Sequence, residues 1–391
     1  MLIAGINITV FSYQTSLVIW FKREGAMLYH FIYPLAQKIT FFNVFGYITF
    51  RGAIAFVLSF LLCLIFFPPF IKKMKEVKAA QIIRTEGPKS HLTKVGTPTM
   101  GGLVVIVVTV ITMLICGRLD NLYILLLLFC TISFGVIGVL DDYLKLSRHS
   151  SDGLHAKFKL ISQICIAFII SLSIFLIMGR ESSYISIPFV KGLKIDLSWF
   201  YILFGVFLIV GASNAVNLTD GLNGLAGGLL IPVFLTYGLF SYIQGHKDMA
   251  SYLFLDYLPV SGEILVYCLA ILGGLCGFLW YNTHPAEIFM GDTGSLSFGG
   301  IIGTIAMMTK QELLLAIVGG VFVAETVSVM IQVTYFRKTG GKRFFLMAPL
   351  HHHFEQKGWK ETTVVIRFWV IGWLVAGLGM LAVVSPTAWG N

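Results

Sequence analysis

Charged side chains are scarce in this chain of 391 residues: Asp, Glu, Lys and Arg make up 12%, whereas 57% of the residues are apolar. A mean hydropathy of +0.85 excludes a soluble globular protein of this length. The chain also lacks the short alternating strands of an outer-membrane barrel. Several apolar runs are long enough to cross ~30 Å of hydrocarbon as helices. We therefore predict an all-α, polytopic membrane protein.

Cysteine is also scarce, with six residues in the whole chain. None has the spacing of a metal site, and all six lie within apolar runs. These features argue against a disulfide framework and indicate small, buried hydrophobic side chains. The six are Cys63, Cys116, Cys130, Cys165, Cys268 and Cys276.

Acidic residues are fewer than basic ones, and 19 Asp and Glu against 28 Lys and Arg give a formal net charge of +9. The basic excess lies in loops between apolar runs, where it sets membrane orientation and attracts anionic lipids. We therefore expect membrane lipids, and no nucleic acid, as partners of this charge.

Residues 1–26 stand apart from the rest of the chain. An apolar run, 17–21, is followed by Lys22 and Arg23, which is the wrong flank for the charge of a signal peptide, and no small-residue cleavage site follows. Met27 is a candidate for the original start. We interpret 1–26 as a possible N-terminal extension and 27–391 as a single transmembrane domain.

Positive charge predicts how the chain crosses the membrane. The loops after odd-numbered spans contain 18 Lys and Arg residues, and those after even-numbered spans contain 6. Because positive loops stay cytoplasmic, we predict that the odd-numbered loops are cytoplasmic and that both termini lie outside. The loop after the fourth span, at 185–187 and 193–197, fits a small hairpin or an irregular loop equally well. We predict about ten spans: 52–70, 99–116, 122–140, 160–178, 199–216, 225–243, 261–281, 296–309, 313–336 and 368–385.

Carboxylates collect at the predicted cytoplasmic ends of these spans. Asp141 and Asp142 end the third span, where they avoid a cost of roughly 2.5–3.5 kcal/mol at the bilayer midplane. Asp220 follows the fifth span and Asp292 precedes the eighth, and neither has a basic neighbour in sequence. A plain helix end would explain the first pair, but adjacent aspartates repel each other unless a cation or a proton relieves them.

Polar and glycine-rich segments accompany these aspartates. In the first inner loop, Thr97 is predicted to cap a helix that begins at Pro98, and its free N–H groups beside Lys94 suit a phosphate. A plain helix start is the alternative. After the fifth span, Asn217 and Asn223 stand among small residues that let a polar ligand approach the backbone. Glycine-mediated helix packing is the alternative there.

Aromatic and histidine side chains occupy two more inner loops. Phe289 precedes Asp292 by three residues and offers either a ring for stacking on a base or an interfacial anchor. The fifth inner loop contains His351, His352 and His353, which suit proton transfer or phosphate contact near neutral pH. Zinc is the rival, but adjacent histidines without a nearby cysteine lack the spacing of a closed zinc site.

The four aspartates, the histidines and a lysine therefore share one face of the membrane. Mg²⁺ prefers one or two carboxylates together with phosphate oxygens. The pattern predicts a metal-assisted reaction of a phosphate-bearing cytosolic substrate at this face.

These motifs resemble those of the polyprenyl-phosphate N-acetylhexosamine-1-phosphate transferases over roughly residues 30–385. The aspartate motifs are shared across that superfamily, and the triple histidine resembles its muramoyl-pentapeptide branch. Ten spans with both termini outside, hence periplasmic in a bacterial cytoplasmic (inner) membrane, also agree with the family. The segments that carry the resemblance are 87–88, Lys94, 97–102, 141–143, 214–226, 289–292, Gln332 and 347–355.

The resemblance implies transfer of phospho-MurNAc-pentapeptide from UDP-MurNAc-pentapeptide to undecaprenyl phosphate, which gives lipid I and UMP and requires Mg²⁺. It implies that Asp292 holds the metal and that Asp141 and Asp142 activate the acceptor phosphate. A homodimer is compatible with the family. The catalytic candidates are Asp141, Asp142, Asp292 and His351. The substrate-binding candidates are Lys94, Thr99, Asn217, Asp220, Asn223, Phe289 by stacking, Gln332 near the uracil, and His352.

Asn223 departs from the family, because many relatives carry aspartate there. An amide still forms hydrogen bonds but supplies no charge, so a metal role at this position is doubtful. Direct attack by the acceptor phosphate and a covalent aspartate intermediate both fit the sequence. A sibling transferase that uses UDP-GlcNAc is the nearest alternative function. A secondary transporter is the alternative from another class, although transporters place polar sites near the midplane in paired repeats.

Overall fold

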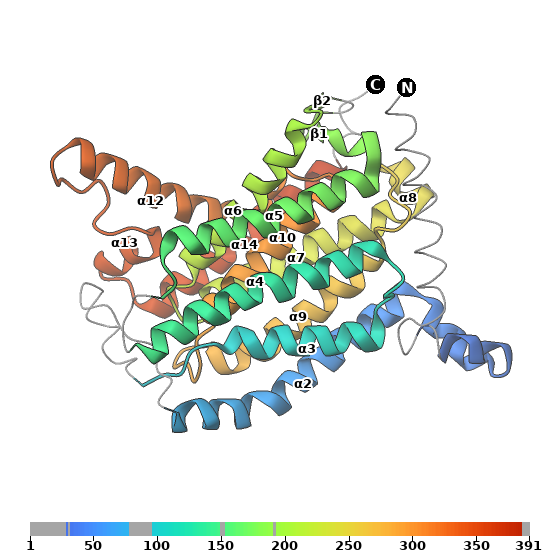
Figure 1. Ribbon diagram of the computed structural model, residues 1–391, viewed down its shortest axis with the longest axis horizontal. Coiled ribbons are helices and arrows are strands. Elements are labelled where there is room, and N and C mark those ends of the chain that lie inside the picture. The colour runs from blue at the N-terminus through green and yellow to red at the C-terminus, as the bar shows by residue number, and fades with distance from the viewer. Residues whose placement is uncertain (1–28, 30–31, 78–95, 149–152, 191–192, 385–391) are drawn as a thin grey trace.

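The computed structural model describes residues 29, 32–77, 96–148, 153–190 and 193–384, and this part of the chain is almost entirely helical (Figure 1). The helices and strands are η2 (Tyr33–Gln37), η3 (Thr40–Gly46), α2 (Ile48–Glu76), α3 (Gly101–Cys116), α4 (Leu122–Ser147), α5 (Ala156–Met178), η5 (Gly179–Ser183), β1 (Tyr184–Ser186), β2 (Lys194–Asp196), α6 (Phe200–Thr219), α7 (Leu225–Gln244), α8 (Lys247–Tyr252), α9 (Glu263–Asn282), α10 (Gly291–Met308), α11 (Leu315–Val318), α12 (Gly320–Lys338), α13 (Leu350–Gln356) and α14 (Glu361–Val384).

Seven helices in the described ranges are long and apolar enough to cross a membrane: α2, α4, α5, α6, α7, α9 and α14. The shorter helix α3 and helices α10 and α12 occupy the remaining predicted spans. Several boundaries differ from the prediction; α4, for example, continues to Ser147, and α14 begins at Glu361. Helix α2 continues to Glu76 through a lysine-rich last turn, and Gly319 interrupts the ninth span between α11 and α12. The count of ten spans stays a prediction.

Helix α10 lies at the centre of the bundle and packs against α3, α4 and α6, and every one of its residues from Thr293 to Met308 is buried. Small residues allow this close packing. A side chain at Gly299 would meet the backbone of Ala212 and Ser213, and one at Gly303 would meet Ile209, all on α6. The short buried helix therefore holds its first turn, which contains Asp292, in a fixed place.

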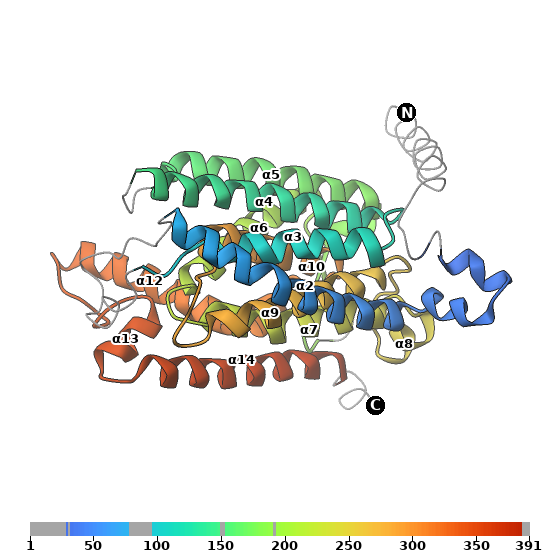
Figure 2. The ribbon, with the colours of Figure 1, turned by 90° about the horizontal axis from the view of Figure 1, so that it is seen from below.

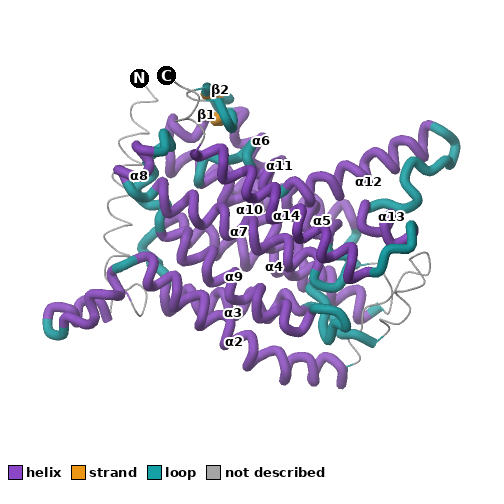
Figure 3. Tube along the Cα trace, turned by 180° about the vertical axis from the view of Figure 1, so that it is seen from behind, coloured by secondary structure: helices purple, strands orange, loops and turns teal. Residues whose placement is uncertain are grey.

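The periphery of the bundle is formed by α5 along one edge and α14 along the opposite edge (Figure 2). Helix α12 projects from one end of the molecule (Figures 1 and 3). Its exposed side chains include Met330, Val333 and Phe336. Such an apolar surface suits contact with lipid rather than with water.

A buried ion pair joins α2 to α9 at the end of the bundle opposite α13. The Arg51 guanidinium lies 2.8 and 2.5 Å from the two carboxylate oxygens of Glu263, and it also donates to the Cys116 carbonyl at 3.3 Å. Arg51 is 1% exposed and Glu263 5%. Buried charges of this kind are tolerated only when they are paired.

Two local expectations are decided by the structure. β1 and β2 pair antiparallel, with Ile185 opposite Ile195, so the outer loop forms the hairpin and not the irregular alternative (Figure 3). All six cysteines are free, as expected. Cys165, however, is exposed on α5, and Cys276 is only half-buried, so the prediction of burial was wrong for these two. Both side chains lie on outward-facing parts of their helices, which a run of apolar residues in sequence does not distinguish from inward-facing parts.

Candidate active site

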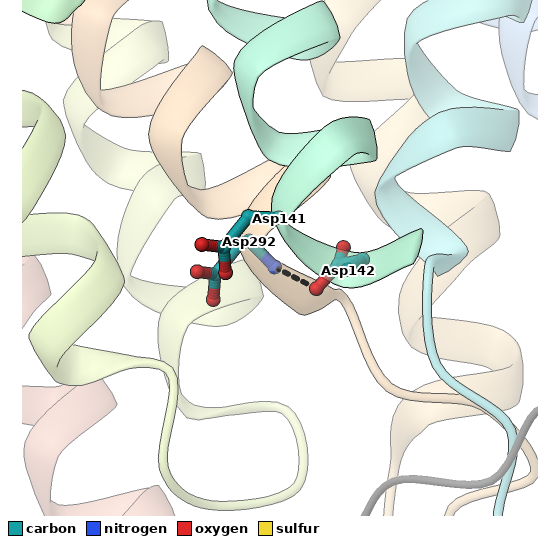
Figure 4. A group of neighbouring side chains, drawn as sticks. All are labelled: Asp141, Asp142 and Asp292. Carbon is teal, nitrogen blue, oxygen red and sulfur yellow. Dashed lines mark hydrogen bonds between the residues drawn. The ribbon is translucent and has the colours of Figure 1, made fainter. Parts of the chain in front are cut away.

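Three carboxylates from two helices converge at one end of the bundle (Figure 4). This is the end that carries α13 (Figure 1). Asp141 and Asp142 lie near the end of α4, and Asp292 is the second residue of α10. One oxygen from each carboxylate lies within 4.8 Å of one oxygen from each of the others. The packing of α4 against α10 thus brings together residues that are about 150 positions apart in sequence.

Asp142 binds the first turn of α10. Its Oδ1 accepts the N–H of Asp292 at 3.1 Å. Its Oδ2 accepts the N–H of Thr293 at 3.0 Å and the Thr293 hydroxyl at 2.7 Å. A carboxylate at this position accepts hydrogen bonds from N–H groups that a helix start leaves without partners. Its negative charge is also stabilised by the positive end of the helix dipole. Both oxygens of Asp142 therefore hold Asp292 in place.

Two lysines neutralise the other two carboxylates. The Nζ of Lys145 lies 2.6 Å from Asp141 Oδ2 and 2.9 Å from Asp292 Oδ2. The Nζ of Lys159, in the first turn of α5, lies 2.5 Å from the same Asp292 oxygen. Asn217 donates to the other Asp292 oxygen at 3.0 Å.

Sequence reasoning missed both lysines as site residues. Lys145 follows Asp141 by four positions, so the two side chains share a helix face, and this spacing was an available signal. Lys159 entered the prediction only as a topological charge, and nothing in its sequence neighbourhood indicates the contact with Asp292. Just before α5, the Leu154 N–H donates to Asp141 Oδ1 at 2.9 Å, so this segment lies against Asp141.

The site holds more negative than positive charge, and this excess affects the pKa of Asp220. Burial raises the pKa of the Asp220 carboxyl, and the negative charges of Asp292 and Asp142 raise it further, to about 7 from an ordinary value of 3.8. Asp220 directly follows α6. A cation placed among these carboxylates would favour the ionised form of Asp220.

The donor set fits Mg²⁺. Three aspartates supply oxygen ligands, which this hard cation prefers, and their closest oxygens lie within a 4.8 Å cluster. Both oxygens of Asp142 already accept hydrogen bonds from α10. One oxygen of Asp292 instead accepts from two lysine ammonium groups, which balance its charge as a metal cation would. Asp292 is therefore the aspartate best placed to bind a metal.

The segment before α3 differs from the prediction. Thr97 does not cap a helix, because α3 begins at Gly101 after Met100, whose φ of 71° lies in the left-handed region. Instead, Pro98 accepts the Phe289 N–H at 2.9 Å, and the Gly101 N–H donates back to the Phe289 carbonyl at 2.7 Å. Backbone pairing with the neighbouring segment thus uses N–H groups that the prediction left free for a phosphate.

This pairing places two other predicted residues. Thr99 is buried beside Gly291, where an added side chain would lie 2.9 Å from the Thr99 hydroxyl. Phe289 is half-buried, three residues before Asp292. Lys94, also predicted to contact substrate, lies outside the described residues, as do 87–88 and 1–26.

The three histidines of α13 have three different environments. His351 is buried, and its ring Nδ1 lies 3.2 Å from Glu325 Oε2. The backbone N–H of His351 donates to Glu325 Oε1, also at 3.2 Å. Its Nε2 faces Gly221, beside Asp220. His352 Nδ1 lies 2.8 Å from Glu355 Oε2, and His353 Nδ1 accepts the Leu346 N–H at 3.1 Å. The rings of His351 and His352 lie 4.2 Å apart, but the Nδ1 atoms of the three histidines contact three different partners.

Asn223 and Gln332 make contacts of different kinds. The buried Asn223 Oδ1 has no hydrogen-bond partner in the described part of the chain. Gln332 on α12 accepts the N–H groups of Phe344 and Phe345 at 3.2 and 2.9 Å. Gln332 thus holds the loop after α12, and no described contact joins it to the aspartates.

Comparison with known proteins identifies the class to which this carboxylate centre belongs. Residues 124–310, which include Asp141, Asp142, Asp220 and Asp292, match the family model described as Glycosyl transferase family 4. The molecule is therefore a membrane protein of the glycosyl transferase class.

Full-length relatives narrow the class. The chain is 51% identical over 356 residues to a phospho-N-acetylmuramoyl-pentapeptide-transferase of Desulfotalea psychrophila, covering 91% of this chain and 99% of the relative. It is 50% identical to the enzyme of the same name from Syntrophus aciditrophicus, over 90% of this chain and 98% of the relative. It is 48% identical to that of Rickettsia montanensis, again over 90% and 98%. The chain belongs to the phospho-N-acetylmuramoyl-pentapeptide-transferase family.

Proposed function

We propose that the protein transfers phospho-MurNAc-pentapeptide from UDP-MurNAc-pentapeptide to undecaprenyl phosphate and releases UMP, with lipid I as the lipid product. The carboxylate centre with its two lysines supports this reaction best. Such a centre at one end of a membrane bundle suits a water-soluble diphosphate donor that meets a lipid-borne phosphate at headgroup level. The family of the chain supports the same donor and acceptor.

In this reaction an oxygen of the acceptor phosphate attacks the phosphorus attached to the sugar of the donor. A new P–O–P linkage forms, and the bond to UMP breaks. Asp141 orients the acceptor phosphate and takes its proton where one is present. Because both oxygens of Asp142 are bound to α10, it positions Asp292 and is a poor candidate for a covalent nucleophile.

Asp292 would hold Mg²⁺, and Asp141 and Asp142 are the other carboxylates of the cluster that could contribute oxygens. When it is bound, the metal supplies positive charge that stabilises the diphosphate and the departing UMP. Lys145 and Lys159, which contact Asp292 in this structure, then supply positive charge to the substrate phosphates.

The donor nucleotide occupies the side of the site formed by the α6–α7 loop and Phe289. Asn217, Asp220 and the unpartnered Asn223 Oδ1 supply polar contacts, and Phe289 stacks on the uracil. The family resemblance assigns the remaining donor contacts to His351 and His352, at the diphosphate, and to Lys94, Thr99 and Gln332.

The protein spans the bacterial inner membrane about ten times, with the site facing the cytoplasm and both termini in the periplasm. Residues 27–391 form one transferase domain. A second copy of the chain is the partner in a homodimer. The charge of the predicted loops supports this orientation.

The test is UMP release by purified protein given UDP-MurNAc-pentapeptide, undecaprenyl phosphate and Mg²⁺. We expect release that requires the lipid and is abolished by EDTA. Asp292→Asn should lower kcat at least about 100-fold, because it removes a charge from the metal ligand.

The controls distinguish the alternatives. Turnover of UDP-GlcNAc, and not of UDP-MurNAc-pentapeptide, would move the chain to the sibling transferases. Absence of UMP with either donor, in protein that unfolds cooperatively, would contradict the proposal and favour a transporter.

A further inference from the structure

The first turns of α14 bind the loop that joins α6 to α7. Glu361 Oε1 accepts the N–H of Asn223 at 2.9 Å. Further along the same face of the helix, the Trp369 indole N–H donates to the Gly224 carbonyl at 3.1 Å. The same indole covers Gly228, where any side chain would collide with the ring. Side chains of α14 therefore hold both the N–H of Asn223 and the carbonyl of Gly224 by hydrogen bonds.

This turn needs such support because of its conformation. Gly224 has φ +78°, in the left-handed region that disfavours residues with a side chain. Its N–H donates to Asn282 Oδ1 at 2.8 Å, so α9 provides a third attachment. With these bonds the backbone places Asn223 and, three residues earlier, Asp220.

The same end of α14 also supports the histidine helix α13. The ring of Phe368 meets the edge of Phe354 at 6.0 Å, and Phe354 stacks on Trp359 at 4.6 Å. The Arg367 guanidinium lies over the Trp359 ring at 4.2 Å. Since His351 Nε2 lies against Gly221, α14 contacts both segments that meet at this point.

We propose that Glu361 and Trp369 are positioning residues for the donor nucleotide, acting through the backbone of Asn223 and Gly224. This inference rests on the proposed function, in which the α6–α7 loop binds the uridine half of the donor. Glu361 and Trp369 hold the loop in its binding conformation before the nucleotide arrives, so the donor does not have to order it. Preorganised loops of this kind improve binding of one ligand without changing the affinity for another.

The experiment compares four variants by UMP release with each substrate varied in turn. Glu361→Ala removes the acceptor, whereas Glu361→Gln removes the charge but keeps an acceptor oxygen. Trp369→Phe removes the indole N–H. The matched control is Trp373→Phe, one turn further along α14, where the side chain is 49% exposed.

We expect Glu361→Ala and Trp369→Phe to raise the KM for UDP-MurNAc-pentapeptide by about threefold to tenfold, the effect of one hydrogen bond. The KM for undecaprenyl phosphate should stay within about twofold in the same variants. Glu361→Gln and Trp373→Phe should resemble the wild type in both values. A parallel rise in both KM values, or no rise in either, would overturn the proposal.

Two further measurements do not depend on turnover. Hydrogen exchange of peptides covering 220–226 should be faster in Glu361→Ala than in Glu361→Gln, and calorimetric binding of UMP should weaken by the same threefold to tenfold factor. Unchanged exchange in Glu361→Ala would overturn the positioning role even if the transferase is active. Faster exchange in a protein that releases no UMP would instead overturn the proposed function and leave the loop contact established.

Discussion

Asp141 and Asp142 show how neighbouring residues acquire different roles. Successive helical residues point about 100° apart, so one side chain faces the lysines while the other faces the first turn of α10. Asp141 contacts Lys145 and the Leu154 N–H, whereas the described hydrogen bonds of Asp142 all come from backbone and hydroxyl donors of α10. A pair that looks equivalent in sequence therefore has two different sets of partners, the lysines for Asp141 and the first turn of α10 for Asp142.

Asp220 makes the stability of the metal-free protein depend on pH. Its pKa is raised to about 7 in the folded state, first by burial and then by Asp292 and Asp142. A raised pKa means that the fold favours the protonated form, so its contribution to stability is complete below an unfolded pKa of about 3.9. That contribution is lost as the pH rises through about 7. Melting of the wild type in EDTA should therefore shift to lower temperature between pH 6 and pH 8.

The matched variant is Asp220→Asn, which removes the titrating group and keeps its size. We expect its Tm to change less than that of the wild type over the same pH range. Equal pH dependence in the two proteins would show that Asp220 is already ionised at pH 6.

At the scale of elements, the most extensive packing is between helices that are not consecutive in the sequence. Helix α2 packs along α9, and α10 packs along α4 and α6. The ion pair of Arg51 and Glu263 joins the first of these pairs far from the aspartates.

Loss of this ion pair should weaken the fold without changing the chemistry. Arg51→Met leaves Glu263 charged and buried, which costs about 3–5 kcal/mol. We expect a large drop in Tm in detergent, with kcat of the remaining folded protein within about twofold of the wild type. The matched control is Lys194→Met, since the side chains of Lys194 and its Asp256 partner are 43% and 40% exposed and such a surface pair contributes about 0–1 kcal/mol. Similar Tm values for the two variants would contradict this account.

For the whole molecule, the predicted orientation can be tested at its two ends. Lys247 begins α8 and Lys342 follows α12, and both residues are exposed. In a Cys165→Ala background, a membrane-impermeant maleimide should label Lys247→Cys on intact cells stripped of the outer membrane. Lys342→Cys should react only after the inner membrane is opened. The reverse pattern would invert the topology. Labelling of both residues from outside would contradict the odd number of crossings, three, that is predicted between them.

Much of the fold could be predicted because burial in a membrane leaves a strong record in the chain. Runs such as 122–140 and 261–281 became α4 and α9 with ends shifted by a few residues, since lipid requires helices that satisfy their own backbone. The predictions failed where backbone partners come from elsewhere. Thr97 does not cap a helix, because the next residue, Pro98, pairs with Phe289. Gly319 interrupts an apolar run that hydropathy alone predicts as one span.

The sequence by itself determined the membrane class, the approximate helices, the family and the four aspartates, because hydropathy and short motifs are local properties. Only the tertiary structure decided that Asp142 binds the start of α10, that Lys145 and Lys159 face Asp292, and that α14 holds the turn at Asn223. These contacts join segments far apart in the chain, and their distances depend on how helices pack. No local pattern encodes that packing, which small residues on α10 and α6 make possible.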